Sequence, residues 1–193
     1  MVFAVCPSGS EDIYNIYIYP ENFGGDDRLR QILQVREEIM SNERLIIVGG
    51  VAGGASAAAR ARRLCEYCEI IMFERGPHVS FANCGLPYFV GGEIAEQDSL
   101  LVQTPESLKA RFNLDVRINT EVIRIDRAAR RIRVRECETG REYEEAYDAL
   151  ILSMGASPLR PPIPGIERPN HFVVRNIPDV ENIMAWSNDC QRC

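Results

Sequence analysis

The stretch LIIVGGVAGGASAAARARRLCEYCEIIMFE, residues 45–74, contains the complete pattern of a β-α-β unit. Leu45–Val48 is a continuous apolar run, as expected of a buried parallel strand. Gly53–Leu64 is rich in alanine and arginine and predicts a helix, and Glu69–Phe73 predicts a second strand. Because strand, glycine turn, helix and strand follow one another within about thirty residues, the sequence predicts an α/β fold with a parallel sheet.

The turn between the first strand and the helix is typical of dinucleotide binding. Small residues let the backbone approach a pyrophosphate, whose charge the helix N-terminus attracts. Gly49 and Gly54 occupy the first and third positions of GxGxxG, while Val51 replaces the second glycine. Glu74 ends the next strand and is placed to accept hydrogen bonds from ribose hydroxyls. FAD, NAD and NADP each fit this acid and the Arg75 that follows it.

Composition indicates a globular protein without a general affinity for nucleic acid. Hydrophobic residues make up 46% of the 193-residue chain and charged residues 26%, both average values. The net charge of −6 argues against nucleic-acid partners. No apolar run approaches the length of a membrane span, and MVFAVCPSGS lacks the features of a secretory signal. A cytoplasmic protein without a membrane partner is predicted.

The seven cysteines favour reduced thiols over a disulfide framework, because their number is odd and their positions are scattered. Two CxxC pairs, Cys65/Cys68 and Cys190/Cys193, together offer four zinc ligands. More than a hundred residues separate the pairs, whereas the usual signature keeps its ligands close together. We therefore predict no metal site.

The remainder of residues 40–177 extends the same domain. Thr104 and Pro105 predict a helix start as N-cap and first-turn proline. A proline-rich segment, Pro158–Pro169, is expected to leave the domain before one more short strand and a helix at Pro178–Trp186. The alternating segments Val116–Asn119, Glu121–Asp126, Arg131–Glu136 and Arg141–Glu145 predict a small antiparallel meander inserted before a buried strand at Tyr147–Ser153.

The two ends differ from this domain. Residues 1–39 form an atypical extension, in which Ile13–Tyr19 alternates weakly and Leu29–Ile39 suits a short helix. We interpret Met40 as the natural start and the preceding residues as an added leader, which mass spectrometry of the native N-terminus tests. Residues 178–193 are interpreted as a truncated tail.

A candidate redox residue lies just after the acid-bearing strand, in the motif SFANCGLPY, residues 80–88. Cys84 is expected to open a short helical segment, where a helix N-terminus favours the reactive thiolate. The alternative, a buried structural cysteine, is common for isolated cysteines. The surrounding motif favours the redox role.

With these motifs, Leu45–Pro178 resembles the N-terminal flavin domain of the pyridine nucleotide–disulfide oxidoreductases. It is most similar to the coenzyme A-disulfide and persulfide reductases. The matching stretches are IIVGGVAGGASAAARARRL, FERGPHVSFANCGLPYFVGGEI and YDALILSMGASPLRPPIPGI. The resemblance implies a Rossmann-like FAD-binding domain and NAD(P)H as electron donor. The implied cofactor-binding residues are Gly49, Gly50, Val51, Ala52, Gly53, Gly54, Glu74, Arg75, Val122, Ser153 and Gly155.

The resemblance also implies the chemistry at Cys84. Members of the glutathione-reductase type have CxxxxC, but Phe89 stands five residues after Cys84. Single-cysteine members form a mixed disulfide with a small thiol or, as in water-forming NADH oxidases, cycle through sulfenic acid. Asn83 favours the coenzyme A-disulfide type. Persulfide, polysulfide and oxygen stay open as substrates, as do NADH and NADPH as donors.

Coenzyme A binding is implied for residues matching Ser56, Arg60, Arg63, Ser80 and Asn83. Arginines suit phosphates because they offer charge and several donors. The alternative for the two arginines is a solvated helix face. His78 and His171 show no triad or metal spacing and are given no catalytic role.

The resemblance covers about the first third of a family member, so the flavin domain is incomplete. Family members add a nicotinamide-binding domain, a second flavin-contacting segment and a domain that forms the homodimer. Three interpretations therefore stand: an enzyme with the family chemistry, a flavin-binding fragment without turnover, and a poorly folded gene remnant. We take the family activity as the parent function and expect little or no turnover from the isolated chain.

Overall fold

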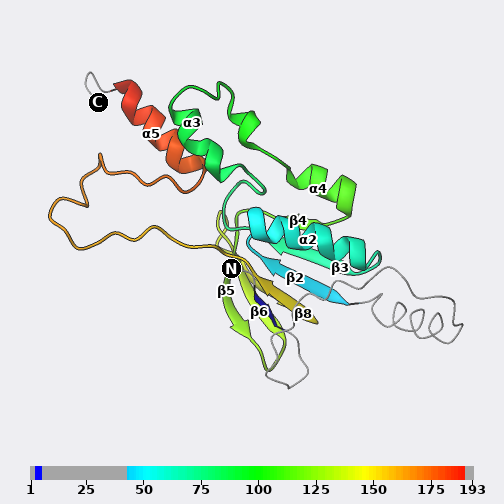
Figure 1. The fold of residues 1–193 in the computed structure, drawn as a ribbon. Helices are drawn as coiled ribbons and strands as arrows, with labels where there is room; N and C mark the ends of the chain where they lie inside the picture. Colours follow the sequence, from blue (N-terminus) through cyan, green and yellow to red (C-terminus); the bar gives the residue numbers. More distant parts are fainter. Residues whose placement is uncertain (1–2, 6–42, 190–193) are drawn as a thin grey trace, which may run out of the picture.

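The computed structural model describes residues 3–5 and 43–189 of the chain. A five-stranded sheet forms its centre (Figure 1). Four strands run parallel to one another, and the edge strand β1 is antiparallel to β8. The spatial order is β1 (Phe3–Val5), β8 (Ala149–Leu152), β2 (Arg44–Val48), β3 (Glu69–Phe73) and β4 (Asp115–Arg117). The predicted α/β class is confirmed.

The inserted antiparallel meander is also present, with one correction. It has three strands, β5 (Thr120–Asp126), β6 (Arg131–Glu136) and β7 (Glu142–Ala146). The assignment of Val116–Asn119 to this meander is wrong, because β4 pairs in parallel with β3 of the large sheet. The reason is topological: the helix that precedes β4 is a crossover, which returns the chain in the direction of β3.

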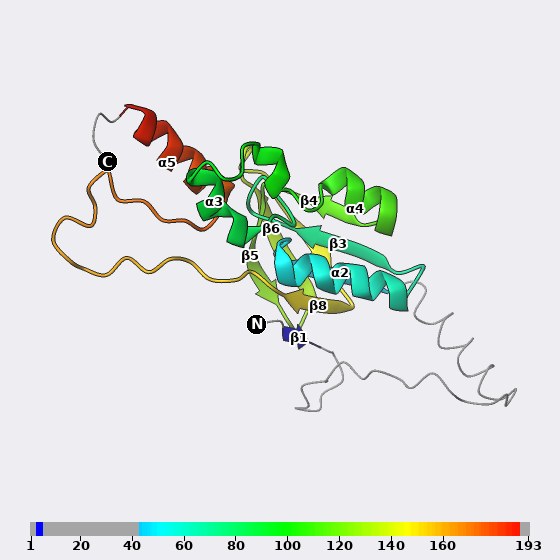
Figure 2. The ribbon, with the colours of Figure 1, turned by 45° about the horizontal axis from the view of Figure 1, so that its top comes forward.

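The large sheet separates two layers. The helices α2 (Ala52–Leu64) and α4 (Pro105–Phe112) pack on one face (Figures 1 and 2). The meander packs on the other, where Ile46 and Val48 contact Ile132 of β6. Ile47, between them in sequence, faces the helices with Ala58. The continuous apolar run of β2 is therefore explained by burial on both faces.

The helix α4 begins where the sequence predicted. Thr104 Oγ1 accepts a hydrogen bond from Ser107 N at 3.2 Å, and Ser107 Oγ accepts one from Thr104 N at 2.9 Å. This capping box satisfies two backbone donors reciprocally. The helix ends at Asn113, whose left-handed conformation (φ +47°) turns the chain into β4.

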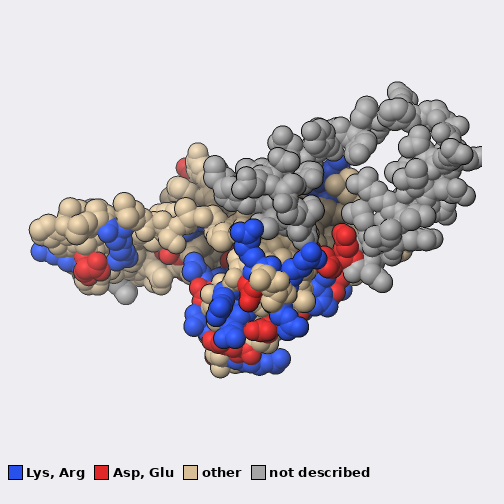
Figure 3. Space-filling view, turned by 90° about the horizontal axis from the view of Figure 1, so that it is seen from below, with Lys and Arg blue, Asp and Glu red and all other residues tan. Residues whose placement is uncertain are grey.

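An arginine joins the large sheet to the meander. Arg117 at the end of β4 donates to Asp115 and, across the layer, to Glu145 of β7 at 2.6 Å. Its guanidinium also lies 5.3 Å from the centre of the Phe73 ring, a cation–π distance. On the outer face of the meander, positive and negative side chains intermingle (Figure 3), as in the Arg135–Glu121 pair.

A group of short helices lies with α5 at one end of the sheet. The short helices α3 (Leu86–Val90) and η2 (Gln97–Leu100) share a small core with α5 (Ile177–Asp189), and η1 (Asn83–Gly85) directly precedes α3. Between β8 and α5 the chain runs as an extended loop away from the sheet (Figures 1 and 2). The proline-rich segment Pro158–Pro169 leaves the sheet as predicted. The short strand expected before α5 is absent from residues 153–176. No neighbouring strand pairs with this segment, so its apolar residues stay in an irregular conformation.

The connection between α2 and β3 corrects the prediction of reduced thiols. Cys65 and Cys68 form a disulfide across the turn that joins these elements. The counting argument failed because it considered all cysteines together, whereas a CxxC pair closes through local geometry alone. Cys84 and Cys137 are free and exposed. The second CxxC pair, Cys190/Cys193, lies outside the described residues, as do Ile13–Tyr19 and Leu29–Ile39.

Candidate functional site

A pocket opens at the carboxyl ends of β2, β3 and β8. The strands β3 and β8 flank β2 on opposite sides, so β2 marks the point where the strand order reverses. Ligands of open α/β sheets bind at such a point. The pocket has a volume of about 400 Å³. Among the residues that line it are Gly49, Val51, Glu74, Arg75, Phe81, Ser153, Met154, Ala156, Arg175, Asn176 and Asp179.

The glycine turn packs too tightly for side chains at two positions. Gly49 has a φ of +96°, and a Cβ atom there would collide with the Ser153 carbonyl. A Cβ atom on Gly54 would collide with the carbonyl oxygen of Gly49 and would lie 2.8 Å from the carbonyl carbon. These are the two positions that match the glycine fingerprint. Gly54 lets α2 approach the end of β2 closely, and Gly49 lets the chain turn.

The acid at the end of β3 fixes this turn. Glu74 Oε2 accepts a hydrogen bond from Gly50 N at 2.7 Å, and Oε1 accepts one from Gly76 N at 2.8 Å. A carboxylate has about four acceptor positions, so both oxygens can still accept from a ligand hydroxyl. The sequence predicted that Glu74 is placed to bind a ribose. Its hydrogen bonds to two backbone amides could not be predicted, because no local sequence pattern indicates them.

The N-terminus of α2 is available to an anion. Its N-cap is Val51, and no side chain makes a capping hydrogen bond there. The first turn also contains no acidic residue. By contrast, α4 carries a capping box. Since the first amides of a helix and its dipole attract negative charge, the end of α2 that borders the pocket suits a phosphate group.

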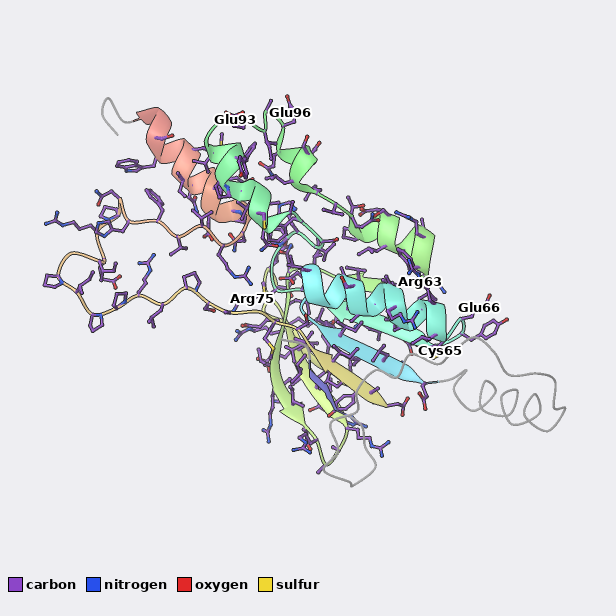
Figure 4. All side chains as sticks on the ribbon, in the orientation of Figure 1. Arg63, Cys65, Glu66, Arg75, Glu93 and Glu96 are labelled. Atoms are coloured by element: carbon purple, nitrogen blue, oxygen red, sulfur yellow. A yellow bond between two sulfur atoms is a disulfide. The ribbon has the colours of Figure 1, made fainter. Side chains whose placement is uncertain are left out.

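Arg75 reaches from the pocket towards the meander (Figure 4). Its Nη1 lies 3.5 Å from Glu121, which also accepts a hydrogen bond from Arg135 at 2.6 Å. The hydrogen bond from Arg135 lowers the pKa of Glu121, burial opposes this, and the charge of Arg135 and the contact with Arg75 lower the pKa further, so that it ends below its usual value. Arg75 is therefore held near the pocket by a carboxylate that stays ionised.

The turn after β8 forms the opposite wall, and Arg175 holds it. Gly155 has a φ of +70°, and Arg175 Nε donates to the carbonyl oxygen of Ala156 at 2.8 Å. With the Asn83 amide oriented to satisfy its neighbours, Arg175 Nη1 also donates to its oxygen at 3.1 Å. Arg175 thus connects the turn after β8 to the residue before Cys84. Sequence reasoning missed it because these partners lie far away in sequence.

The Cys84 loop begins at the pocket, where Phe81 lines the wall, but Cys84 itself is not among the lining residues. Ser80, with a φ of +46°, donates from its backbone N to Gly50 O at 2.9 Å, which ties the loop to the glycine turn. Phe81 is buried and lines the pocket. Cys84 lies on η1, directly before α3, and is exposed. Its thiol is therefore accessible to a substrate.

Three of the predicted coenzyme A contacts share one face of α2. Ser56, Arg60 and Arg63 are exposed and follow one another at helical spacing. Within residues 43–189, neither arginine forms an ion pair. Arg62 points elsewhere: its guanidinium donates to the carbonyl oxygens of Phe112 at 2.8 Å and Asn113 at 3.1 Å. The face therefore carries two arginines that have no ion-pair partner among the described residues.

The remaining predicted cofactor residues lie in or beside the glycine turn, with one exception. Gly50 is a buried residue of the turn itself. Ala52 and Gly53 are the first two residues of α2. Val122 lies on β5, half-buried against the core of the meander, and does not line the pocket.

Two kinds of feature are absent from the described part of the chain. It contains no group of three or more His, Cys, Asp or Glu residues arranged to hold a metal ion. In the same residues, no helix has the length and apolar character needed to cross a membrane.

Comparison with known proteins agrees with this geometry. The coenzyme A disulfide reductase of Staphylococcus epidermidis is 41% identical over 140 residues, which cover 72% of this chain and 31% of that protein. Reduced CoADR-RHD of Bacillus anthracis superposes with a TM-score of 0.74 at 52% identity, over 77% of this chain and 27% of that one. An NAD-dependent persulfide reductase from A. fulgidus superposes with a TM-score of 0.71 at 34% identity. The match covers 76% of this chain and 27% of that one.

The family model for pyridine nucleotide-disulphide oxidoreductases matches residues 43–189. This family depends on FAD and takes its electrons from NAD(P)H. The chain spans about 31% of the length of the curated relatives it matches. The glycine turn, the acid at the end of β3 and the family match agree, and the chain therefore belongs to the pyridine nucleotide-disulphide oxidoreductase family.

Proposed function

We propose that this chain is the FAD-binding part of an NAD(P)H-dependent reductase that acts on coenzyme A disulfide through Cys84. The observation that carries the proposal is the uncapped N-terminus of α2 beside a glycine turn that Glu74 holds in place. The identity of 41% to a coenzyme A disulfide reductase supports the choice of substrate. We propose a cytoplasmic location, as the sequence predicts.

The residues around the pocket fit the adenosine diphosphate part of FAD. The amides at the start of α2 would face the pyrophosphate, and Glu74 would accept hydrogen bonds from the ribose. A pocket of about 400 Å³ is within the usual range for small-molecule sites. When bound, FAD would relay the electron pair of NAD(P)H that cleaves the Cys84–coenzyme A disulfide, returning Cys84 to its thiolate and releasing the first coenzyme A. The wall formed by Ser153 and Ala156 would hold the cofactor opposite Glu74.

Cys84 would act as the nucleophile. Its thiolate attacks one sulfur of coenzyme A disulfide, a Cys84–coenzyme A disulfide forms, and the second coenzyme A leaves as a thiolate that takes up a proton. The exposure of Cys84 supports attack on a large substrate. Asn83 is fixed by Arg175 and would position the adjoining thiol loop.

The face of α2 formed by Ser56, Arg60 and Arg63 would bind the phosphates of coenzyme A. Its two guanidinium groups are exposed, and no described carboxylate neutralises them. An arginine offers several donors to a phosphate group, and the serine hydroxyl adds one more. We propose that Ser80 and Asn83 complete this substrate site next to Cys84.

The first experiment measures cofactor uptake and adduct formation separately. Purified chain is mixed with FAD, freed of unbound flavin and examined by absorbance and by the mass of the released cofactor. It is then treated with coenzyme A disulfide and digested for peptide mass spectrometry. Stoichiometric FAD and a coenzyme A adduct on the Cys84 peptide are expected.

Cys84→Ser should keep the flavin and lose this adduct, whereas Cys137→Ser, which changes another exposed thiol, should keep both. A folded chain that binds no FAD would contradict the cofactor proposal. Flavin-loaded protein whose Cys84 reacts with a persulfide but not with coenzyme A disulfide would instead favour the persulfide reductases.

Arg175 provides a further prediction about this site. Arg175→Gln removes the charged donor that joins Ala156 to Asn83. The turn after β8 and the Cys84 loop should then no longer be held together. We expect FAD affinity to fall about tenfold, as the loss of one charge-assisted hydrogen bond implies. The alkylation rate of Cys84 should change as well. Arg168→Gln, in the loop between β8 and α5, is the matched control and should change neither quantity.

A further inference from the structure

A second pair of sulfur atoms lies apart from the Cys84 site. The Cys65–Cys68 disulfide joins the end of α2 to the start of β3, with the two Cα atoms 5.6 Å apart. The pocket lies at the opposite end of α2, which at 13 residues is about 20 Å long. Figure 4 shows Cys65 beside Arg63 and Glu66 at this far end of the helix. The disulfide therefore does not belong to the flavin pocket.

The two cysteines differ in their access to solvent. Cys65 is half-buried, and its neighbours Leu64 and Tyr67 are 64% and 74% exposed. Cys68 is only 8% exposed and packs in the core with Ile70. Cys65 packs only partly against the same core, so it is the more accessible of the two to a small thiol. This asymmetry gives a CxxC pair one attackable and one resolving position.

The backbone of the turn is held independently of the disulfide. Arg62 Nη1 donates to the carbonyl oxygens of Cys65 at 3.1 Å and Glu66 at 2.5 Å. The same guanidinium donates to Phe112 O and Asn113 O at the end of α4. Because these bonds do not involve sulfur, the turn stays in place when the disulfide opens. The two thiols then remain close together, which favours closing the bond again.

We propose that Cys65 and Cys68 form a reversible dithiol–disulfide site that exchanges with small-molecule thiols through Cys65. A thiolate attacks Cys65 Sγ, a mixed disulfide forms, and the Cys65–Cys68 bond breaks with its electron pair on Cys68, which takes a proton from water. A second thiolate attacks the small-molecule sulfur of the mixed disulfide and releases Cys65. Two thiols are thereby oxidised to one disulfide, and the protein disulfide is reduced to two thiols. This site goes beyond the proposed function and does not depend on it.

The test equilibrates the purified chain with reduced and oxidised glutathione at a series of ratios. The samples are quenched with an alkylating reagent, and the peptide containing residues 65–68 is quantified by mass spectrometry. The proposal expects a reversible two-electron transition within the glutathione range, reached from either the oxidised or the reduced protein. A pair that stays oxidised, or stays reduced, at every ratio would overturn it.

Two single variants test the order of attack. Cys68→Ser leaves Cys65 as the only thiol of the pair and should form a mixed disulfide with oxidised glutathione. Cys65→Ser leaves the protected Cys68 and should react at least about tenfold more slowly, as access controls exchange. Equal rates, or a faster reaction at Cys68, would contradict the proposal that exchange proceeds through Cys65. Cys137→Ser should leave the transition of the wild-type pair unchanged, since Cys137 lies in the turn between β6 and β7.

Discussion

Replacing Gly54 with alanine should weaken FAD binding by about a hundredfold. The new methyl group would collide with the Gly49 carbonyl, which is backbone and cannot rotate aside. To make room, α2 would have to move away from the end of β2, and its first amides would move with it. Forcing an extra methyl group into a tight contact costs about 1–3 kcal/mol or more. Because this overlap is with backbone, the cost lies at or above the upper end of that range, and since each 1.4 kcal/mol is a factor of ten, we expect FAD affinity to fall by about a hundredfold.

Flavin fluorescence titration measures this loss, and denaturant unfolding shows whether the chain still folds. Gly91→Ala is the matched control. Gly91 has a φ of −75°, and a Cβ there would lie 3.4 Å from the nearest atom, an ordinary contact. It should bind FAD as the wild type does. If the Gly54 variant were to keep wild-type affinity, the close approach of α2 would have no role in cofactor binding.

The second large effect is expected from Glu74→Gln. The substitution keeps the shape of the side chain but replaces one carboxylate oxygen with an NH₂ group. Gly50 N or Gly76 N, which each donate to this carboxylate, then faces another donor. Leaving one donor unsatisfied costs about 1–3 kcal/mol. We expect lower thermal stability and a weakening of FAD binding by about tenfold to a hundredfold.

Glu93→Gln is the control for this change. Glu93 and Glu96 lie near α3 and η2, well away from Arg75 and the glycine turn (Figure 4). Glu93 is exposed, so its amide variant should keep both stability and affinity. Calorimetry and flavin titration distinguish the two variants. A Glu74 variant with unchanged FAD affinity and reduced stability would assign the acid to the turn alone, and not to the cofactor.

The sequence predicted those parts of the fold that have local signals. Leu45–Val48 and Glu69–Phe73 are apolar runs bounded by turn residues, and both form strands of the sheet. Thr104 predicted the start of α4 correctly because capping depends on only a few neighbouring residues. The alternation in Val116–Asn119 indicated a strand that overlaps β4 (Asp115–Arg117), but alternation alone does not determine its partner. The preceding α4 contained the missing information, since a helix between two strands favours a parallel crossover.

In the candidate site, too, the sequence predicted only the residues that have a local signal. Gly49 and Gly54 could be recognised from their spacing, and the structure explains why a side chain fits at neither position. Arg175 could not be recognised, because its partners Ala156 and Asn83 are 19 and 92 residues away along the chain. The Cys65–Cys68 pair was visible as a motif. Its oxidation state depends on how α2 ends, which the cysteine count does not reveal.

The pairing of β8 with β2 also has a consequence for how the chain acquires its pocket during synthesis. Residues 44–74, with the glycine turn and the acid, are contiguous and can form early. Their sheet partner β8 pairs Leu45 with Ala149, and the opposite pocket wall at Ser153 follows β8. At a synthesis rate of about 5–20 residues per second, this wall leaves the ribosome several seconds later. Such non-local pairing slows folding, and stable capture of a dinucleotide has to await the late-arriving strand.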